Sequence, residues 1–158
     1  MDTRVGLGLS SNRAVEQHLL LLEKNDIARC WPRIEVALDA DPSLWNSAWT
    51  KDDLLAKALS GDVQVWCVQL GDEFTMLLMT QLWPTFNEKY LQIFWAYGED
   101  LESALELLSD VFDKFAAQHG AGQIEIVGRK GFERLLRPFG FEHMYTSYRR
   151  DVKLQRSN

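Results

Sequence analysis

The side chains that could do chemistry in this 158-residue chain are scattered along it. Three pairs of adjacent acids could bind a metal ion or act as general acids: Asp52-Asp53, Asp72-Glu73 and Glu99-Asp100. Each pair lies where the sequence predicts a helix start or a turn, and acids at such positions stabilise those structures without a catalytic role. His119 and His143 are expected at a helix end and in a loop, so neither is assigned as a base.

Short motifs with a defined mechanism are missing from the sequence. The chain has no GxxxxGK[ST], HExxH or GxSxG motif and no zinc-finger spacing. Its two cysteines, Cys30 and Cys67, lie in apolar stretches without a CxxC pair or a paired histidine. We therefore expect two buried, reduced thiols rather than a disulfide or a metal site.

Charge is distributed unevenly along the chain. Residues 1–128 hold 9 basic and 20 acidic side chains, a net charge of -11, whereas residues 129–158 hold 8 basic and 3 acidic side chains, a net charge of +5. This polarity argues against general nucleic-acid binding by the whole molecule. The basic C-terminal part could form a positive surface, although solvated charge that aids solubility is the simpler interpretation.

Composition and length predict one folded domain. The chain is 46% apolar and 25% charged, and a chain of this length usually buries a single core. The apolar run 19–22 is too short for a signal peptide or a membrane span. We divide the chain into an N-terminal arm (residues 1–13), a single domain (residues 14–152) and a C-terminal tail (residues 153–158).

Hydrophobic periodicity predicts the elements of the first half. Residues 14–23 fit a buried strand or a helix start, and we take the strand. Asp26 is the predicted N-cap of a helix with Pro32 in its early turns. Its apolar positions recur every three or four residues: Ile27, Trp31, Ile34 and Leu38. Thr50 and Asp53 predict a capping box in front of a second helix.

The second half predicts a meander followed by a crossover. Its elements are, in order, a hairpin of strands 63–68 and 74–83, strand 90–96, a long helix ending at Gly120, strand 123–127, a short helix 131–139 and strand 144–152. The long helix carries one apolar face: Leu101, Leu105, Leu108, Val111, Phe112 and Phe115. This order predicts a mixed α/β domain of the α+β type with one central sheet.

The order of elements resembles the GCN5-related N-acetyltransferase (GNAT) fold from about residue 14 to residue 152. The segment GRKGFERLLRPFGF, residues 128–141, is in addition similar to a signature of GNAT-like proteins carried by bacteriophages. The resemblance implies a mixed central sheet with a β-hairpin, a long helix after the fourth strand and a short helix before the last strand. In short-tailed phages, proteins of this kind lie among the virion genes.

Family enzymes bind the coenzyme A pyrophosphate in a glycine-rich loop before the long helix. Glycines there let backbone N–H groups and the helix N-terminus close around the phosphates. The matching stretch here, residues 95–103, has one glycine, no arginine or lysine, and three carboxylates, those of Glu99, Asp100 and Glu102. Each carboxylate would oppose the pyrophosphate by about 1 kcal/mol or more. The residues of this stretch therefore predict that the loop no longer binds coenzyme A.

The residue that protonates the leaving thiolate in such enzymes is commonly a tyrosine four residues before the Gly-Phe pair. Here that position is Leu136, and Arg129 replaces an asparagine common further back. Tyr145 and Tyr148 could substitute as general acids, although tyrosines in a final strand are more often packing residues. Loss of catalysis is the simpler interpretation.

Exposed tryptophans and arginines could form a protein interface. Trp31, Trp66 and Trp95 fit core positions, whereas the other three tryptophans flank prolines and loops. For those three, core packing and an interface weigh about equally. The candidate interaction residues are Trp45, Trp49, Trp83, Arg129, Arg134 and Arg137.

Two functions follow from the resemblance. In the first, the chain is a non-catalytic bacteriophage structural or virion-associated protein without a cofactor, in the virion or the host cytoplasm, and binds other phage structural proteins or a second copy of itself. In the alternative, it is an acetyl-CoA-dependent N-acyltransferase that modifies a host or phage amine. Gly98 and the backbone amides at Leu101, Glu102 and Ser103 would then hold the pyrophosphate, and Tyr145 or Tyr148 would be the acid. Neither function involves a specific nucleic acid or a membrane span.

A small module that binds an acidic host partner through the basic tail is a third possibility.

Overall fold

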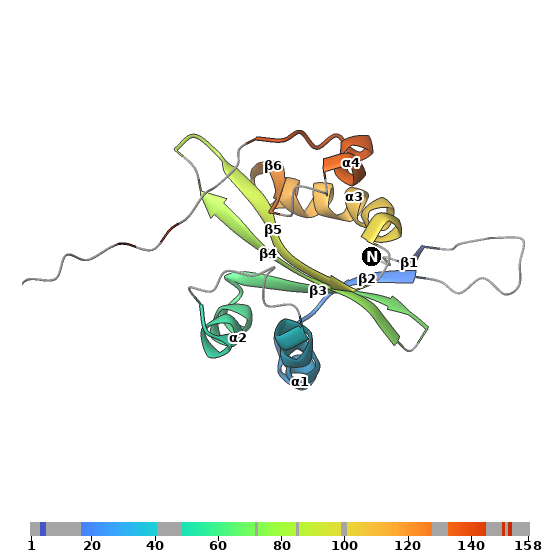
Figure 1. Ribbon diagram of the computed structural model, residues 1–158, viewed down its shortest axis with the longest axis vertical. Helices are drawn as coiled ribbons and strands as arrows, with labels where there is room; N and C mark the ends of the chain where they lie inside the picture. The colour runs from blue at the N-terminus through green and yellow to red at the C-terminus, as the bar shows by residue number, and fades with distance from the viewer. Residues whose placement is uncertain are drawn as a thin grey trace, which may run out of the picture.

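Six strands of the described residues form one sheet, with helices on both of its faces (Figure 1). The computed structural model describes residues 4–5, 17–40, 49–71, 73–84, 86–98, 101–127, 133–144, 150 and 152. The strands are β1 (Arg4–Val5), β2 (Gln17–Leu21), β3 (Val63–Leu70), β4 (Glu73–Pro84), β5 (Lys89–Gly98) and β6 (Ala121–Ile126). The helices are α1 (Lys24–Ala40), α2 (Lys51–Ser60), α3 (Leu101–Gln118), α4 (Glu133–Leu136) and the 3-10 turn η3 (Arg137–Phe139).

The strands lie in the sheet in chain order, and every neighbouring pair is antiparallel except β5 with β6. Helices α1 and α2 connect β2 to β3 and lie below the sheet in Figure 1, whereas α3 and α4 lie above it. The parallel pair needs a crossover, which α3 supplies. The predicted mixed sheet with a hairpin and a long crossover helix is confirmed.

Strand β3 is buried on both faces and separates two apolar clusters. Val63, Val65 and Cys67 pack in the cluster with α1 and α2, which we call cluster 1. Trp66 and Val68 alternate with them and pack in the cluster with α3, which we call cluster 2. This alternation follows from the two-residue period of a strand. The expected core tryptophans, Trp31, Trp66 and Trp95, are all buried.

Strand β5 contains an irregularity opposite Met79 and Thr80. Thr80 pairs with Ile93 and Met79 pairs with Trp95, so Phe94 is an extra residue in β5. Such a bulge rotates the strand locally. Phe94 and Trp95 therefore both pack in cluster 1, although they are consecutive.

Helix α1 begins at Lys24, three residues before the start that an N-cap at Asp26 predicts. Ile27 N–H donates to Glu23 O at 2.9 Å, so the helix is already formed at Asp26. Asp26 is therefore a first-turn residue bonded to Arg29 at 2.7 Å, and its predicted role as N-cap is wrong. Pro32 lies in the helix interior rather than in an early turn, and its side chain is exposed.

Helix α2 begins where the capping box predicts. Thr50 Oγ1 accepts from Asp53 N–H at 3.0 Å, and Thr50 N–H donates to the Asp53 carboxylate at 3.2 Å. Both bonds of the capping box are present. Gly61 ends the helix with φ of +91°, a conformation that favours glycine.

The two ends of the chain differ in part from the sequence prediction. Within the predicted N-terminal arm, Arg4–Val5 pairs with β2 at the edge of the sheet. The predicted last strand, 144–152, falls mostly outside the described residues, and Met144, Arg150 and Val152 are not in a strand. The division into arm, domain and tail stays a prediction. Among the described helices, none has the length and hydrophobicity that crossing a bilayer requires.

The two cysteines should differ in reactivity. Both are free thiols; Cys67 is fully buried and Cys30 partly exposed. Burial raises the pKa of Cys67 to about 12, and nearby Cys30 and Asp26 add to the rise. Because the thiolate is the nucleophile, an aromatic disulfide reagent at pH 8 should modify Cys30 in the folded chain and Cys67 only after unfolding in urea. Cys30→Ser should remove the native-state reaction; rapid labelling of Cys67 in that variant would contradict the assignment.

Candidate functional site

The structure places the predicted pyrophosphate site at the junction of β5 and α3. Gly98 is the last residue of β5, and Leu101, Glu102 and Ser103 form the first turn of α3. Glu99 and Asp100 lie outside the described residues, as do the side chains of Leu101 and Ser103. Two residues separate the end of the strand from the helix, so the helix N-terminus and its free N–H groups lie beside the end of β5.

Gly98 has a structural reason to be glycine. Its φ is +143°, and a Cβ built on it would overlap Thr75 O and lie 2.9 Å from Met76 Cα. Gly98 pairs with Met76 in the ladder between β4 and β5. The glycine is therefore required by the close approach of the hairpin strands, whether or not a ligand is present.

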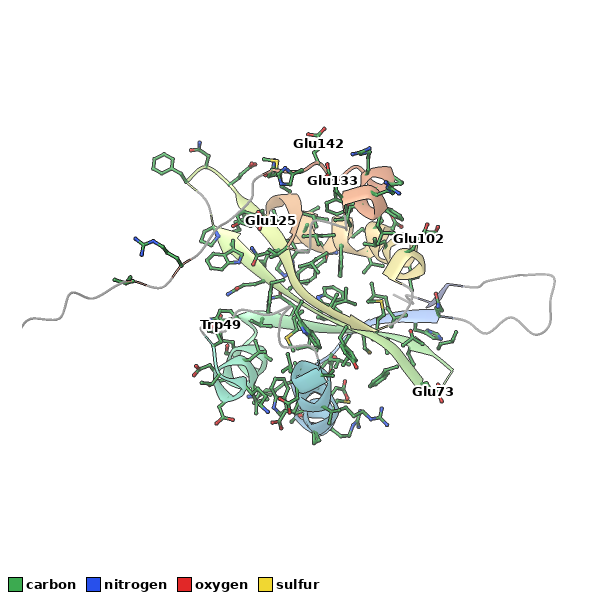
Figure 2. All side chains as sticks on the ribbon, viewed as in Figure 1. Trp49, Glu73, Glu102, Glu125, Glu133 and Glu142 are labelled. Atoms are coloured by element: carbon green, nitrogen blue, oxygen red, sulfur yellow. The ribbon has the colours of Figure 1, made fainter. Side chains whose placement is uncertain are left out.

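The carboxylate of Glu102 is exposed at the start of α3, as Figure 2 shows. It lies in the first helical turn, where a negative charge stabilises the helix dipole. A phosphate group at the same helix end would be opposed by this charge, but solvent and salt screen an exposed carboxylate strongly. The repulsion at Glu102 weakens an anion site here without excluding it.

The parallel ladder between β5 and β6 ends in the middle of β5. Its last pair is Ile93 with Ile126, and Val127 N–H donates to Ile93 O at 3.0 Å. Residues 95–98 of β5 continue to pair with β4 on one side, after the bulge at Phe94. Within the described ranges they have no strand partner on the β6 side. Among the described residues, a strand edge without a partner on the β6 side therefore runs over residues 94–98, between Ile93 and the start of α3.

A row of polar side chains lies next to the point where the two strands separate. Gln92 Nε2 donates to Glu125 Oε1 at 2.7 Å, and Trp83 Nε1 donates to Gln92 Oε1 at 2.9 Å. The row crosses β4, β5 and β6, and Gln92 and Glu125 are partly buried. Ile124 and Ile126 pack in cluster 2, so strand alternation places Glu125 on the opposite face, the one that α1 and α2 cover in part.

Aromatic side chains border this polar row. Trp49 lies just before α2 and meets Phe94 edge to face, with 5.8 Å between the ring centroids. Lys57 Nζ lies 5.0 Å from the centroid of the Trp49 ring. Trp95 stacks on Tyr97, which is 37% exposed. The polar row thus begins where cluster 1 ends.

The predicted interaction residues have different surroundings. Trp49 packs against cluster 1, so it contributes to the core, and Trp83 is 38% exposed and belongs to the polar row. Arg134 and Arg137 are exposed, and Arg137 Nη2 lies 3.5 Å from Glu133 Oε1. The other predicted site residues lie outside the described residues: Trp45, Arg129, Tyr145 and Tyr148.

Sequence reasoning missed Gln92 and Glu125. Both lie in predicted strands, and Glu125 is the one acid in the apolar stretch IEIV. An acid in such a stretch signals a polar face, but its partner is 33 positions away in sequence. Only strand pairing brings the two side chains together.

A pocket of about 400 Å³ lies between α3, β6 and the turn after α4. Its walls include Leu105, Phe112, Ile124, Phe139 and Phe141. The pocket includes neither Gly98 nor Glu102, so it is separate from the helix N-terminus.

Metal binding is not supported by the described side chains. Across the described ranges, no three His, Cys, Asp or Glu side chains are grouped so that they could hold a metal ion.

Several crystal structures share this architecture. An aminoglycoside acetyltransferase, meta-AAC0020 from an uncultured soil metagenomic sample in complex with sisomicin, is 12% identical with a TM-score of 0.63, over 87% of this chain and 97% of that one. The ribosomal-protein-alanine N-acetyltransferase of Brucella melitensis biovar Abortus 2308 is 12% identical with a TM-score of 0.61, over 87% and 99%. A second soil metagenomic aminoglycoside acetyltransferase, HMB0005, is 13% identical with a TM-score of 0.65, over 87% and 99%.

These similarities show that the chain has the GNAT acetyltransferase fold, as the resemblance implied. No protein-family model matches the sequence, and no curated protein matches it. The similarity is therefore one of fold. The three proteins just named are acetyltransferases, and nothing in them relates to bacteriophages.

Replacing Gly98 should destabilise the fold itself. Gly98→Ala introduces both an unfavourable φ and an overlap with the backbone of β4, and should lower the free energy of unfolding by about 2 kcal/mol or more. Urea unfolding followed by circular dichroism measures this. Gly122→Ala is a matched control on the same sheet, because its Cβ would meet only the flexible Glu88 side chain, at 3.1 Å. Equal stability of the two variants would show that Gly98 is not needed for the hairpin.

Proposed function

We propose that the chain is an acetyl-CoA-dependent N-acyltransferase. The observation that carries the proposal is the open edge of β5 beyond Ile93, which leads to the N-terminus of α3 in a fold shared with acetyltransferases. Backbone groups on an open strand edge need hydrogen-bond partners, and an extended ligand with amide groups can supply them. The pantetheine arm of coenzyme A is such a ligand.

The described residues fit the cofactor in two respects and oppose it in one. The β5 edge formed by residues 94–98 would bind the pantetheine amides, and the N–H groups of Leu101, Glu102 and Ser103 at the start of α3 would face the pyrophosphate. The Glu102 carboxylate is the opposing group. We therefore expect binding that is weakened by charge and that depends on salt.

When bound, acetyl-CoA supplies an acetyl group activated as a thioester. The protein would hold that group where β5 and β6 separate and keep the acceptor on the face of the polar row. Tyr145 and Tyr148 remain the candidates for the acid that protonates the thiolate. The neighbouring enzymes include one bound to sisomicin and one named for a ribosomal-protein alanine, and from these we infer an amine as the acceptor class.

The virion-associated role remains a prediction from the resemblance at residues 128–141. It would place the chain in the virion or host cytoplasm, with other phage structural proteins or a second copy as partners. Among the described residues only the Glu102 charge favours it over acyl transfer, and Trp49, one of the residues on which it relied, is partly buried and packs against cluster 1.

Calorimetry with acetyl-CoA tests the proposal directly. We expect binding in the micromolar range and release of free thiol when an amine acceptor is added. Coenzyme A without the acetyl group should compete for the same site. Lack of binding at millimolar acetyl-CoA would contradict the proposal and would favour a non-catalytic role.

Glu102→Gln should strengthen acetyl-CoA binding while weakening the helix. Removing a like charge near the pyrophosphate should improve the dissociation constant by about fivefold, equivalent to about 1 kcal/mol at low salt. The same change removes a favourable interaction with the helix dipole and should cost about 0.3–1 kcal/mol of stability. Glu106→Gln, one turn further along α3, is the control for affinity. Equal affinities in both variants would show that the pyrophosphate does not lie at this helix end.

A further inference from the structure

We propose that the cavity between α3, β6 and η3 binds an organic cation with an apolar body, and that the charge of this ligand pairs with Asp113. The inference goes beyond acyl transfer and does not depend on it. The cavity lies on the face of the sheet that α3 and α4 cover, opposite the face of the polar row (Figure 1). A ligand in it would therefore be neither the thioester nor the acyl acceptor of the proposed reaction.

The cavity has the size and the walls of a small-molecule site. Its volume of about 400 Å³ falls within the range of roughly 300–1,000 Å³ that ligand pockets occupy. The walls include three apolar side chains that are themselves buried, those of Ile93, Leu105 and Phe112. A ligand with an apolar body would remove hydrocarbon surface of these walls and of itself from water.

The local structure of three elements creates this space. The end of α3 and the start of β6 contribute small residues, among them Ala117 and Ala121, whose side chains fill little volume. Gly140 ends η3 with φ of +86°, a conformation that favours glycine. The chain reverses there, and Phe139 and Phe141 on either side of the glycine both line the cavity.

Asp113 gives the cavity its preference for positive charge. It is the one charged side chain among the described residues that line the cavity. On the same helix, Asp110 Oδ2 lies 3.7 Å from Lys114 Nζ, whereas no described residue makes an ion pair or hydrogen bond with Asp113. A second carboxylate borders the wall, because a Cβ on Gly122 would lie 3.1 Å from Glu88 Oε2. An anion in the cavity would be repelled by both carboxylates, and a cation would be attracted.

The exposure of Asp113 sets how much its charge contributes. Solvent screens an exposed ion pair, so pairing with Asp113 should change the affinity by up to about fivefold. Most of the affinity must then come from the apolar walls. We therefore expect the same apolar body to bind best as a cation, less well as a neutral molecule and worst as an anion.

Calorimetry on the full chain with three matched probes tests this order. The probes are N,N-dimethyl-4-phenylbutylamine, 4-phenylbutanol and 4-phenylbutyrate, which share one apolar body and differ in charge. The tertiary amine should bind with a dissociation constant below about 1 mM, the alcohol about three- to fivefold more weakly, and the carboxylate more weakly still. The preference for the cation should shrink in about 0.5 M sodium chloride. Equal affinities for the three probes, or no binding of the amine at several millimolar, would overturn the proposal.

Asp113→Asn tests the source of the charge preference, because it removes the charge and keeps the shape. It should lower the affinity for the amine to that for the alcohol and leave the affinity for the alcohol unchanged. Asp110→Asn, the same change three residues earlier on α3, is the matched control, since Asp110 does not line the cavity. A preference for the amine that survives in Asp113→Asn would refute the role of Asp113.

Ala117→Phe tests the place of binding. Ala117 is exposed on α3, so the larger side chain should fill the cavity without disturbing the core. It should weaken the binding of amine and alcohol by about tenfold or more. Gln118→Phe adds a ring at the next exposed position, which does not line the cavity, and should leave both affinities unchanged. Circular dichroism establishes that both variants are folded. Unchanged binding in a folded Ala117→Phe variant would place the ligand elsewhere.

A spectroscopic measurement locates the ligand without any substitution in the walls beyond the one used for assignment. The methyl resonances of Ile124, assigned by their change in Ile124→Val, should shift when the amine is added, because Ile124 lines the cavity. Those of Leu54, in cluster 1 on the other face of the sheet, should stay in place. Shifts at Leu54 without shifts at Ile124 would contradict the site.

The site and the proposed acyl transfer fail separately. A tertiary amine cannot yield a stable amide, so its binding is independent of any acyl transfer. Acetyl-CoA should neither displace the amine nor require it, because the cavity includes neither Gly98 nor Glu102. Displacement of the amine by acetyl-CoA would show that the cavity belongs to the cofactor groove and would overturn the separate site. Loss of amine binding in Asp113→Asn with no binding of acetyl-CoA would leave the cation site standing and overturn acyl transfer.

Discussion

The rest of the structure depends on strand β5 having two different neighbours along its length. On one side it pairs with β4 from end to end, and on the other it pairs with β6 only as far as Ile93. The bulge at Phe94 lies at this change and turns the second half of the strand. Within the described part of the chain, an interior strand thus has a stretch of unpaired edge. Unpaired edges otherwise belong to the outermost strands of a sheet.

The bulge places unusual demands on its surroundings. It directs Phe94 and Trp95 to the same apolar cluster, and Trp95 Nε1 is buried there without a hydrogen-bond partner among the described residues. An unpaired buried donor costs about 1–3 kcal/mol, so the packing of this region must offset it. At the other end of the second half, Gly98 allows β5 to approach β4 closely. Both departures from regular structure border the open edge, as is common at functional sites.

Charge at the helix N-terminus and geometry of the sheet support different functions. The acids between β5 and α3 indicate that this helix end no longer binds a phosphate group, but this indication comes from composition alone. Of the three, only Glu102 is described, and it is exposed, where its repulsion is screened. The open strand edge and the Glu125 row are features of shape and pairing that a purely structural role does not require. We therefore give the geometry more weight than the local charge.

Local structure could be predicted from neighbouring residues: the capping box of α2, the glycine after it, the hairpin and the amphipathic α3 all depend on residues close together in the chain. The pairing of distant strands sets where β6 leaves β5, why Gly98 must be glycine, and that Trp83, Gln92 and Glu125 form one row. These features depend on strand register across long sequence separations, and a one-residue change of register would turn Glu125 to the other face. No local pattern in the chain encodes that register, because it is set by the packing of both helical layers on the sheet.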